Sequence, residues 1–479
     1  MLSSVSLASS SAVVKKLIFV IAFGLICTGI GAQETTSEDA FFIKSIHDTA
    51  LTQGRAYGWL EILTQDVGGR LAGSPGAAAA VQTMYQLMQD ELGFDTVYLQ
   101  PCTAPRWDRA EPEQVRIVNN DRVGTRELPA LALGNSIGTG PAGLTAEVVE
   151  VRSLDEVDKL GAAGVQGKIV FFNRPLDATQ LNTFAAYGGA VDQRVFGASR
   201  AAKYGAVAVL VRSMTTKTDD VPHTGTLRYE DESQQIPALA VSTRAADLMH
   251  QLLADGGNLR IYLRNTSRNL SPVQTFNVIG EVRGSEFPDE IILTGGHLDS
   301  WDVGQGAHDD GAGCVQAMQA WDVLRQLNYR PRRTLRVVLF MNEENGLAGG
   351  RAYWAASDAA NEFHLAAIES DRGGFIPRGF TAEAREDVFV GYLQQLNAWE
   401  DVLSPYGLTF KSGGSGADIG GLKLQGGLLL GLNPDSQRYF DYHHTAADVL
   451  EAVNERELHL GGAAMGSLVY LIDRYGLGR

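Results

Sequence analysis

Apolar, strand-like runs follow one another after residue 273, and segments with helical periodicity separate them. This succession of strand, loop and helix is typical of an α/β domain with a mostly parallel, twisted sheet and helices on both faces. In such folds, ligand sites lie outside the carboxyl ends of the strands. The predicted strands are residues 276–281, 290–294, 335–341, 365–370 and 428–432, and the clearest helix is residues 314–327.

Histidines, acidic residues and glycines follow several of the predicted strands. Residues 295–313 read GGHLDSWDVGQGAHDDGAG and hold two histidines, four aspartates and six glycines. The glycines allow sharp turns, so that side chains can converge at the strand end. Three further clusters follow later strands: Asn342-Glu343-Glu344, Glu369-Ser370-Asp371 and, after a loop, Tyr442-His443-His444.

Carboxylates gathered at the buried edge of a sheet repel one another, and each loses hydration unless a cation or a proton compensates. Histidine and aspartate are also residue types that bind divalent metals. For any one of these acids, a solvated loop position is at least as good an interpretation. Four such clusters at successive strand ends favour a metal site.

The N-terminus has the pattern of a secretory signal peptide, residues 1–32. Two lysines precede the apolar stretch LIFVIAFGLICTGIGA, which ends in small residues before a polar, acidic segment. The apolar part is short for a membrane span, so an uncleaved anchor is the less favoured alternative. We therefore expect a secreted or periplasmic protein with no stable membrane span after signal cleavage.

The net charge and the cysteine content exclude one class of partner and one kind of fold stabilisation. The formal charge of −16 becomes −18 when Lys15 and Lys16 leave with the signal, which argues against nucleic acid as a partner. Cys27 lies in the signal, and Cys102 and Cys314 remain. Two cysteines are too few for a disulfide framework, so we expect both thiols to be unpaired.

The sequence pattern changes between residues 116 and 272. Runs such as KIVFFN, VAVLV and IPALAV alternate there with loops rich in glycine, serine and threonine and with short helices. This indicates a second module inserted into the first. The predicted organisation is a signal at 1–32, the N-terminal part of the main domain at 33–115, the insertion at 116–272 and the main catalytic part at 273–479.

These motifs together resemble the cocatalytic two-zinc peptidases, a family of metallo-exopeptidases. The resemblance covers nearly all of the chain after the signal. It is carried by GHLDSWDVGQGA, the following DDG, and the Glu-Glu, Glu-Ser-Asp and His-His clusters. The middle module, with GKIVFFNR, ASRAAKYGAVAVLVRS and IPALAVS, is similar to the protease-associated domain found in such enzymes.

The resemblance implies two Zn²⁺ per chain, held by five side chains. Asp309 would bridge the two ions. Glu344 and His444 would complete one site, and His297 and Asp371 the other, leaving each ion a position for water. Asp299 would orient His297 without binding metal. Glu343 would be the general base that takes a proton from the attacking water. The expected metal ligands are His297, Asp309, Glu344, Asp371 and His444.

Other polar residues near these positions are expected to play lesser parts. We predict packing or hydrogen-bonding roles for His308 and His443, and turn positions for Asp302 and Asp310. Asp418 matches a family aspartate near the substrate cleft. However, Ala417 precedes it where the family has a small hydroxyl residue, so its role stays open.

The implied activity is hydrolysis of dipeptides or other short peptides, and removal from the amino or the carboxyl end is left open. A homodimer is implied by the resemblance alone. Two alternatives are a non-catalytic, receptor-like binding protein on the same fold and a glutaminyl-cyclase-like transferase. The first is expected to have lost ligands or the base, whereas all six positions are present here. The second works with one zinc and lacks the insertion.

Overall fold

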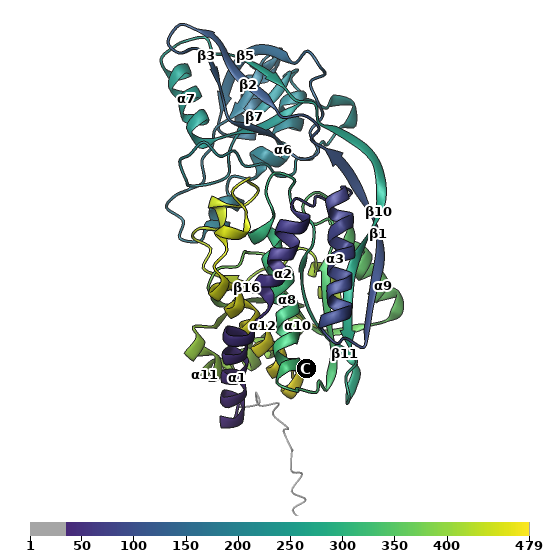
Figure 1. Cartoon of the computed structure of the whole chain (residues 1–479). Helices are drawn as coiled ribbons and strands as arrows, with labels where there is room; N and C mark the ends of the chain where they lie inside the picture. Colours follow the sequence, from purple (N-terminus) through teal and green to yellow (C-terminus); the bar gives the residue numbers. More distant parts are fainter. Residues whose placement is uncertain (1–34, 479) are drawn as a thin grey trace, which may run out of the picture.

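The computed structural model describes residues 35–478 and contains two eight-stranded sheets (Figure 1). The predicted signal, residues 1–32, lies outside the described residues. Helices accompany both sheets, so the predicted α/β class is confirmed. No helix among residues 35–478 has the length and apolar character needed to cross a membrane. Cys102 and Cys314 are buried and form no disulfide.

The first sheet is mixed, with a parallel centre. Strands β12, β11, β13 and β16 run parallel. β10 pairs antiparallel with β1 and β12, and β14 pairs antiparallel with β16 but parallel with β15. The parallel expectation thus applies to the four central strands, and the antiparallel pairings lie on either side of them. In spatial order the strands are β1 (Thr96–Asp108), β10 (Arg268–Val282), β12 (Arg333–Phe340), β11 (Phe287–His297), β13 (Phe363–Glu369), β16 (Leu428–Pro434), β14 (Pro377–Glu383) and β15 (Thr409–Ser412).

Both faces of this sheet are buried, which explains the nearly continuous apolar runs in the sequence. In β12, Leu335, Val337 and Leu339 point into the larger core, and Val338 and Phe340 point into a smaller core on the other face. The larger core also contains residues of α1, α2, α3, α8, α10 and α12, and the smaller one contains Tyr353 of α9. The helices of this domain are α1 (Ser37–Gln53), α2 (Ala56–Glu61), α3 (Pro75–Glu91), α8 (Ala312–Gln326), α9 (Ala348–Ala360), α10 (Glu386–Ala398), α11 (Glu400–Leu403) and α12 (Glu455–Tyr475).

The second sheet forms a separate domain, drawn in blue and teal at the top of Figure 1. Its strands lie between Gln114 and Arg264. The strands in order are β3 (Gly124–Glu127), β2 (Gln114–Asn120), β9 (Arg260–Arg264), β5 (Leu144–Val151), β6 (Ile169–Phe172), β7 (Ala208–Arg212), β8 (Ala238–Val241) and β4 (Ala130–Ala132), and the helices are α4 (Leu154–Val165), α5 (Thr183–Gly188), α6 (Asp192–Ala202) and α7 (Thr243–Ala254).

Two long antiparallel strands, β1 and β10, connect the domains (Figure 1). The loop after β11 makes a second connection. Trp301 of that loop belongs to the hydrophobic core of the second domain, where its ring meets Trp107 edge-on at 6.3 Å. Next to it, Asp302 accepts two hydrogen bonds from Arg109, at 2.7 and 2.8 Å. The predicted turn residue Asp302 therefore helps to attach the domains.

Docking of Trp301 requires a glycine at position 134. A Cβ on Gly134 would lie 1.9 Å from Cη2 of this ring. We expect Gly134→Ala to destabilise the protein by about 1–3 kcal/mol, as overpacking of a filled core does. The measurement is the melting temperature. The control is Gly58→Ala in α2, where nothing lies within 4 Å of the new methyl group and alanine favours the helix. Equal melting temperatures for both variants would contradict tight docking.

Candidate active site

Three neighbouring parallel strands bring their carboxyl ends to one edge of the first sheet. His297 is the last residue of β11 and pairs in register with Phe340, the last residue of β12. The Glu343-Glu344 pair follows β12, and Asp371 follows β13 on the other side of β11. The loop after η6 (Tyr439–Asp441) brings His444 to the same place.

Asp309, which precedes α8, lies at the centre of this group. Its Oδ1 is 3.3 Å from Nε2 of His297, which is also 3.4 Å from Oδ1 of Asp371. Its Oδ2 is 3.3 Å from Nε2 of His444, which is 3.1 Å from Oε2 of Glu344. Asp309 therefore belongs to two clusters of side chains that could hold a metal ion, one on each of its oxygens.

Either His443 or Glu344 could be the third metal ligand beside Asp309 and His444 in the second cluster. The donor atoms of Asp309, His443 and His444 all lie within 4.8 Å of one another and could hold a metal ion. However, Nε2 of His443 is 3.8 Å from Asp309, farther than that of His444, and its ring stacks on the His444 ring at 3.5 Å. The distances favour His444 and Glu344 as ligands, with His443 packed behind.

The donor set fits a divalent metal. Oδ2 of Asp309 and Oε1 of Glu344 are buried and accept no hydrogen bond within residues 35–478. Buried carboxylate oxygens without a donor are costly, and a cation shared between them removes the cost. Two imidazoles and three carboxylates are ligands that zinc accepts.

Burial and neighbouring charges shift the pKa values of these groups. Burial lowers the pKa of His297, but hydrogen bonds that its ring donates to the carboxylates of Asp309 and Asp371 outweigh this effect, so the pKa rises well above its ordinary value. Burial, together with the negative charges of Asp371 and Asp299, raises the pKa of Glu343 to about 8 against the opposing effect of His297. A carboxyl with its pKa near neutrality is suited to exchange protons in catalysis.

Asp299 supports the site differently from the expectation. Nδ1 of His297 donates to the backbone carbonyl of Asp299 at 2.9 Å, whereas the carboxylate is 3.9 Å away. The carboxylate instead accepts backbone hydrogen bonds from Asn342 at 2.6 Å and Glu343 at 2.9 Å. Asp299 thus orients His297 through its main chain and holds the Glu343-Glu344 turn through its side chain.

The backbone is unusual at two site positions. Asn342 has φ 73° and His444 has φ 62°, both in the left-handed region. Such conformations cost on the order of 1 kcal/mol and persist where surrounding contacts impose them. At Asn342 those contacts include the hydrogen bond to Asp299, and at His444 a backbone hydrogen bond of 3.0 Å from Thr224 of the second domain.

The remaining sequence candidates lie around the site. His308 stacks on Phe375, and its two ring nitrogens bond to the backbone of Ala452 and Gly374. Asp310 accepts backbone hydrogen bonds from His297 and Gly313, both at 3.0 Å. Both are therefore structural neighbours. Asp418 is fully buried, and neither of its carboxylate oxygens has a hydrogen-bond partner within residues 35–478.

Several residues near the site had not been singled out from the sequence. Asp448 accepts backbone hydrogen bonds from His308 and Asp309, and the buried Arg70 donates to three backbone carbonyls of residues 298–306. Neither has a local sequence signal, because each contacts the site across a large separation along the chain. The second domain contributes Tyr187, Arg194 and His223.

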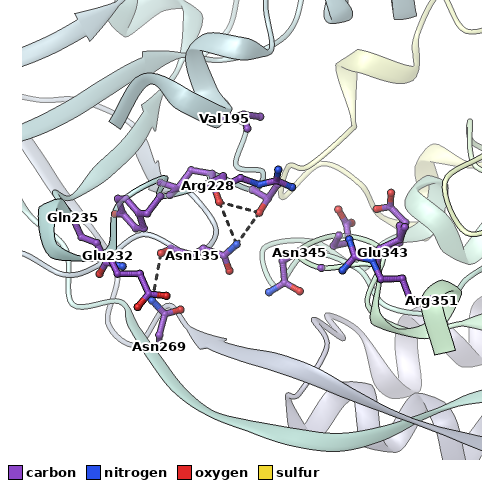
Figure 2. A pocket seen from close by; sticks show the side chains of 15 residues that line it. Asn135, Val195, Arg228, Glu232, Gln235, Asn269, Glu343, Asn345 and Arg351 are labelled. Atoms are coloured by element: carbon purple, nitrogen blue, oxygen red, sulfur yellow. Dashed lines mark hydrogen bonds between the residues drawn. The ribbon is translucent and has the colours of Figure 1, made fainter. Parts of the chain in front are cut away.

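A cavity of about 470 Å³ opens beside the Glu343-Glu344 turn. Figure 2 shows Glu343 and Asn345 on one side of it and Asn135 and Arg228 of the second domain on the other. Its size lies within the range of small-molecule sites. The acidic turn thus faces an open cavity that residues of both domains line.

Comparison with known proteins identifies the relatives of this arrangement. The model of peptidase family M28 matches residues 277–469. Human carboxypeptidase Q is 34% identical over 425 residues, which is 88% of this chain and 85% of the human protein. The crystal structure of a peptidase M28 precursor from Shewanella amazonensis has 34% identity and a TM-score of 0.86, covering 92% of this chain and 98% of its own. A zinc aminopeptidase of Bacillus subtilis shares the fold, with a TM-score of 0.63 at 19% identity and coverage of 88% and 95%.

Substitutions of the two adjacent histidines are expected to change the metal content differently. His444→Ala removes a donor that lies within 3.3 Å of both Asp309 and Glu344, so we expect it to lower bound zinc sharply. His443→Ala removes a packing neighbour and should weaken zinc binding by about 10–100-fold at most. Elemental analysis of both purified variants measures this. Equal zinc loss would mean that His443 is itself a ligand.

Proposed function

Because this chain is a carboxypeptidase Q-like member of peptidase family M28, and thus a zinc metallopeptidase, we propose that it is a two-zinc exopeptidase that hydrolyses dipeptides or short peptides. The observation that carries this proposal is the position of Asp309 between two clusters of metal-binding side chains. Glu344 and His444 would hold one ion with it, and His297 and Asp371 the other. When bound, the ions would polarise the peptide carbonyl and acidify a water molecule.

In this proposal Glu343 is the general base and Glu344 the ligand. Both glutamates border the cavity, but Oε2 of Glu344 lies 3.1 Å from Nε2 of His444, whereas Glu343 forms no ion pair within residues 35–478. Glu343 would take a proton from the attacking water and pass it to the leaving amine. Asp299 would position it through the hydrogen bond to its backbone.

The substrate would enter the cavity between the domains, whose volume of about 470 Å³ suits a short peptide. The N-terminal sequence supports secretion or export to the periplasm. A homodimer is supported by the family resemblance alone. A receptor-like binding protein would not need the intact donor set with a base beside it. A one-zinc transferase would not need the second cluster.

Metal content is the first test of this proposal. The purified enzyme should hold about two zinc ions per chain, because the donor set forms two sites. Chelation should abolish peptide hydrolysis and lower the melting temperature, since a bound ion stabilises only the folded state, and added zinc should restore both. Elemental analysis alongside activity decides it. Full activity with a single bound ion would contradict the two-zinc proposal.

The roles of the two adjacent glutamates give the second test. Glu343→Gln keeps the size of the side chain but cannot accept the proton, so turnover should fall about 10²–10⁴-fold while both zinc ions remain bound. Glu344→Gln removes an anionic ligand, so it should lower zinc content first, and excess zinc should recover part of its activity.

Zinc content and turnover are measured for both variants, with and without added zinc. The Glu344→Gln protein is the matched control, because it carries the same change one residue along the chain. If Glu343→Gln loses zinc and is rescued while Glu344→Gln keeps both ions, the two roles are reversed.

A further inference from the structure

A second cavity, of about 630 Å³, lies beside the carboxyl-end edge of the first sheet. Its wall combines Phe184 of α5 in the second domain with residues of β14, β15 and β16 in the first. The charged residues that line it are three cations, Arg372, Arg378 and Lys411, and one acid, Asp435. We call it the basic cavity. Its charge contrasts with that of the whole chain, which is −16.

The basic cavity borders one of the two clusters that could hold a metal ion. Arg372 directly follows Asp371, whose Oδ1 lies 3.4 Å from Nε2 of His297. The first cavity borders Glu344, which belongs to the other cluster, and Asp309 joins the two clusters. Consecutive Cα atoms are about 3.8 Å apart, so the basic cavity begins one residue away from the candidate metal centre.

Two of the three cations have no carboxylate bound to them within residues 35–478. Arg378 forms an ion pair with Asp435 at 3.1 Å. Arg372 and Lys411 form no ion pair with any residue that the structure describes, although both line the same cavity. The cavity therefore offers two positive charges that are free to meet an anion from outside the chain.

Neutral groups hold the guanidinium of Arg372 in place. Nη1 donates to Oδ1 of Asn433 at 3.3 Å, and Nη2 donates to the backbone carbonyl of Gly414 at 2.9 Å. The guanidinium carbon also lies 5.4 Å from the ring of Phe184, which is close enough for a cation–π contact. These contacts orient the half-buried side chain and leave its other N–H groups available to an acceptor.

The neighbouring acids do not use these donors. Asp371 and Glu369 act on Arg372 electrostatically, but neither accepts a hydrogen bond from it. The charge of Asp371 would in addition be offset by a metal ion bound at its cluster.

We propose that the basic cavity binds a carboxylate, with Arg372 and Lys411 as its cationic partners. Guanidinium and ammonium groups form charge-assisted hydrogen bonds with carboxylates, and such bonds are stronger than neutral ones. The carboxylate could come from an acidic side chain of a peptide bound at the metal centre or from a free small acid. This inference goes beyond the proposed function, which concerns only the bond that is cleaved.

The first test compares dipeptides that differ only in one side-chain charge. The pairs are aspartyl-leucine with asparaginyl-leucine, and leucyl-aspartate with leucyl-asparagine. We expect the zinc-loaded wild type to show a higher kcat/KM for the acidic member of one pair. That ratio should fall on the order of tenfold in Arg372→Gln and in Lys411→Gln, because each variant loses one charge-assisted interaction.

The matched control is Lys423→Gln. It makes the same change as Lys411→Gln at a side chain that pairs with Glu383 at 2.8 Å and does not line the basic cavity. It should leave the ratio unchanged. If Arg372 only braces Gly414 against Asn433, Arg372→Gln should lower the melting temperature and slow both members of a pair equally, and Lys411→Gln should have no effect.

The second test concerns a free acid. The melting temperature of the zinc-loaded protein is measured with succinate and with succinamide, which has no charge. Succinate should raise it more, since a ligand that binds only the folded state stabilises that state. The difference should shrink in Lys411→Gln but not in Lys423→Gln. Binding of succinate to the metal ions would be the same in both variants and so cannot produce this contrast.

The two tests together identify the source of the carboxylate. A charge preference among the dipeptides that depends on Arg372 and Lys411 identifies a substrate side chain. A succinate effect without such a preference identifies a free acid. If neither measurement depends on these two residues, the proposal is overturned, while cleavage of the asparagine-containing dipeptides leaves the exopeptidase function intact. If no dipeptide is cleaved, the proposed function fails, and the succinate measurement alone decides whether the cavity binds a carboxylate.

Discussion

The carboxyl-end edge of the first sheet depends on neutralising the negative charge of the buried carboxylates around Asp309. This residue is 4% exposed and lies within 3.3 Å of imidazoles on both of its oxygens. Its backbone is held by Asp448, and the neighbouring Glu343-Glu344 turn is held by Asp299. These contacts fix anionic groups at separations that a cation can bridge, and a bound cation would offset their mutual repulsion.

The second domain contacts the loops at this edge of the first sheet and also lies over it. Thr224 donates to the backbone of His444, Trp301 anchors the loop after β11, and α6 brings Arg194 to the far side of the His444 ring. The side chains that could hold metal ions come from the first domain, whereas residues of both domains line the cavity.

Much of the first sheet was predictable because its central strands are buried on both faces and read as apolar runs. The predicted strand at 335–341 corresponds to β12, Arg333–Phe340. The sequences of β14, PRGFTAE, and β15, TFKS, were not predicted, since they mix polar and apolar residues and lie at the edge of the sheet. Residues 276–281 were predicted as a strand and form part of β10, but an apolar run does not reveal that this strand pairs antiparallel with β12.

The sequence by itself determined the set of side chains available at the strand ends, because residue type and position after an apolar run depend only on local order. It also indicated a second module. Only the tertiary structure decided which atom of Asp299 meets His297, that His443 stacks behind His444, and that Arg194 lies unpaired beside them. Those relations join residues far apart in the chain, so they follow from how strands and domains pack and not from any local pattern.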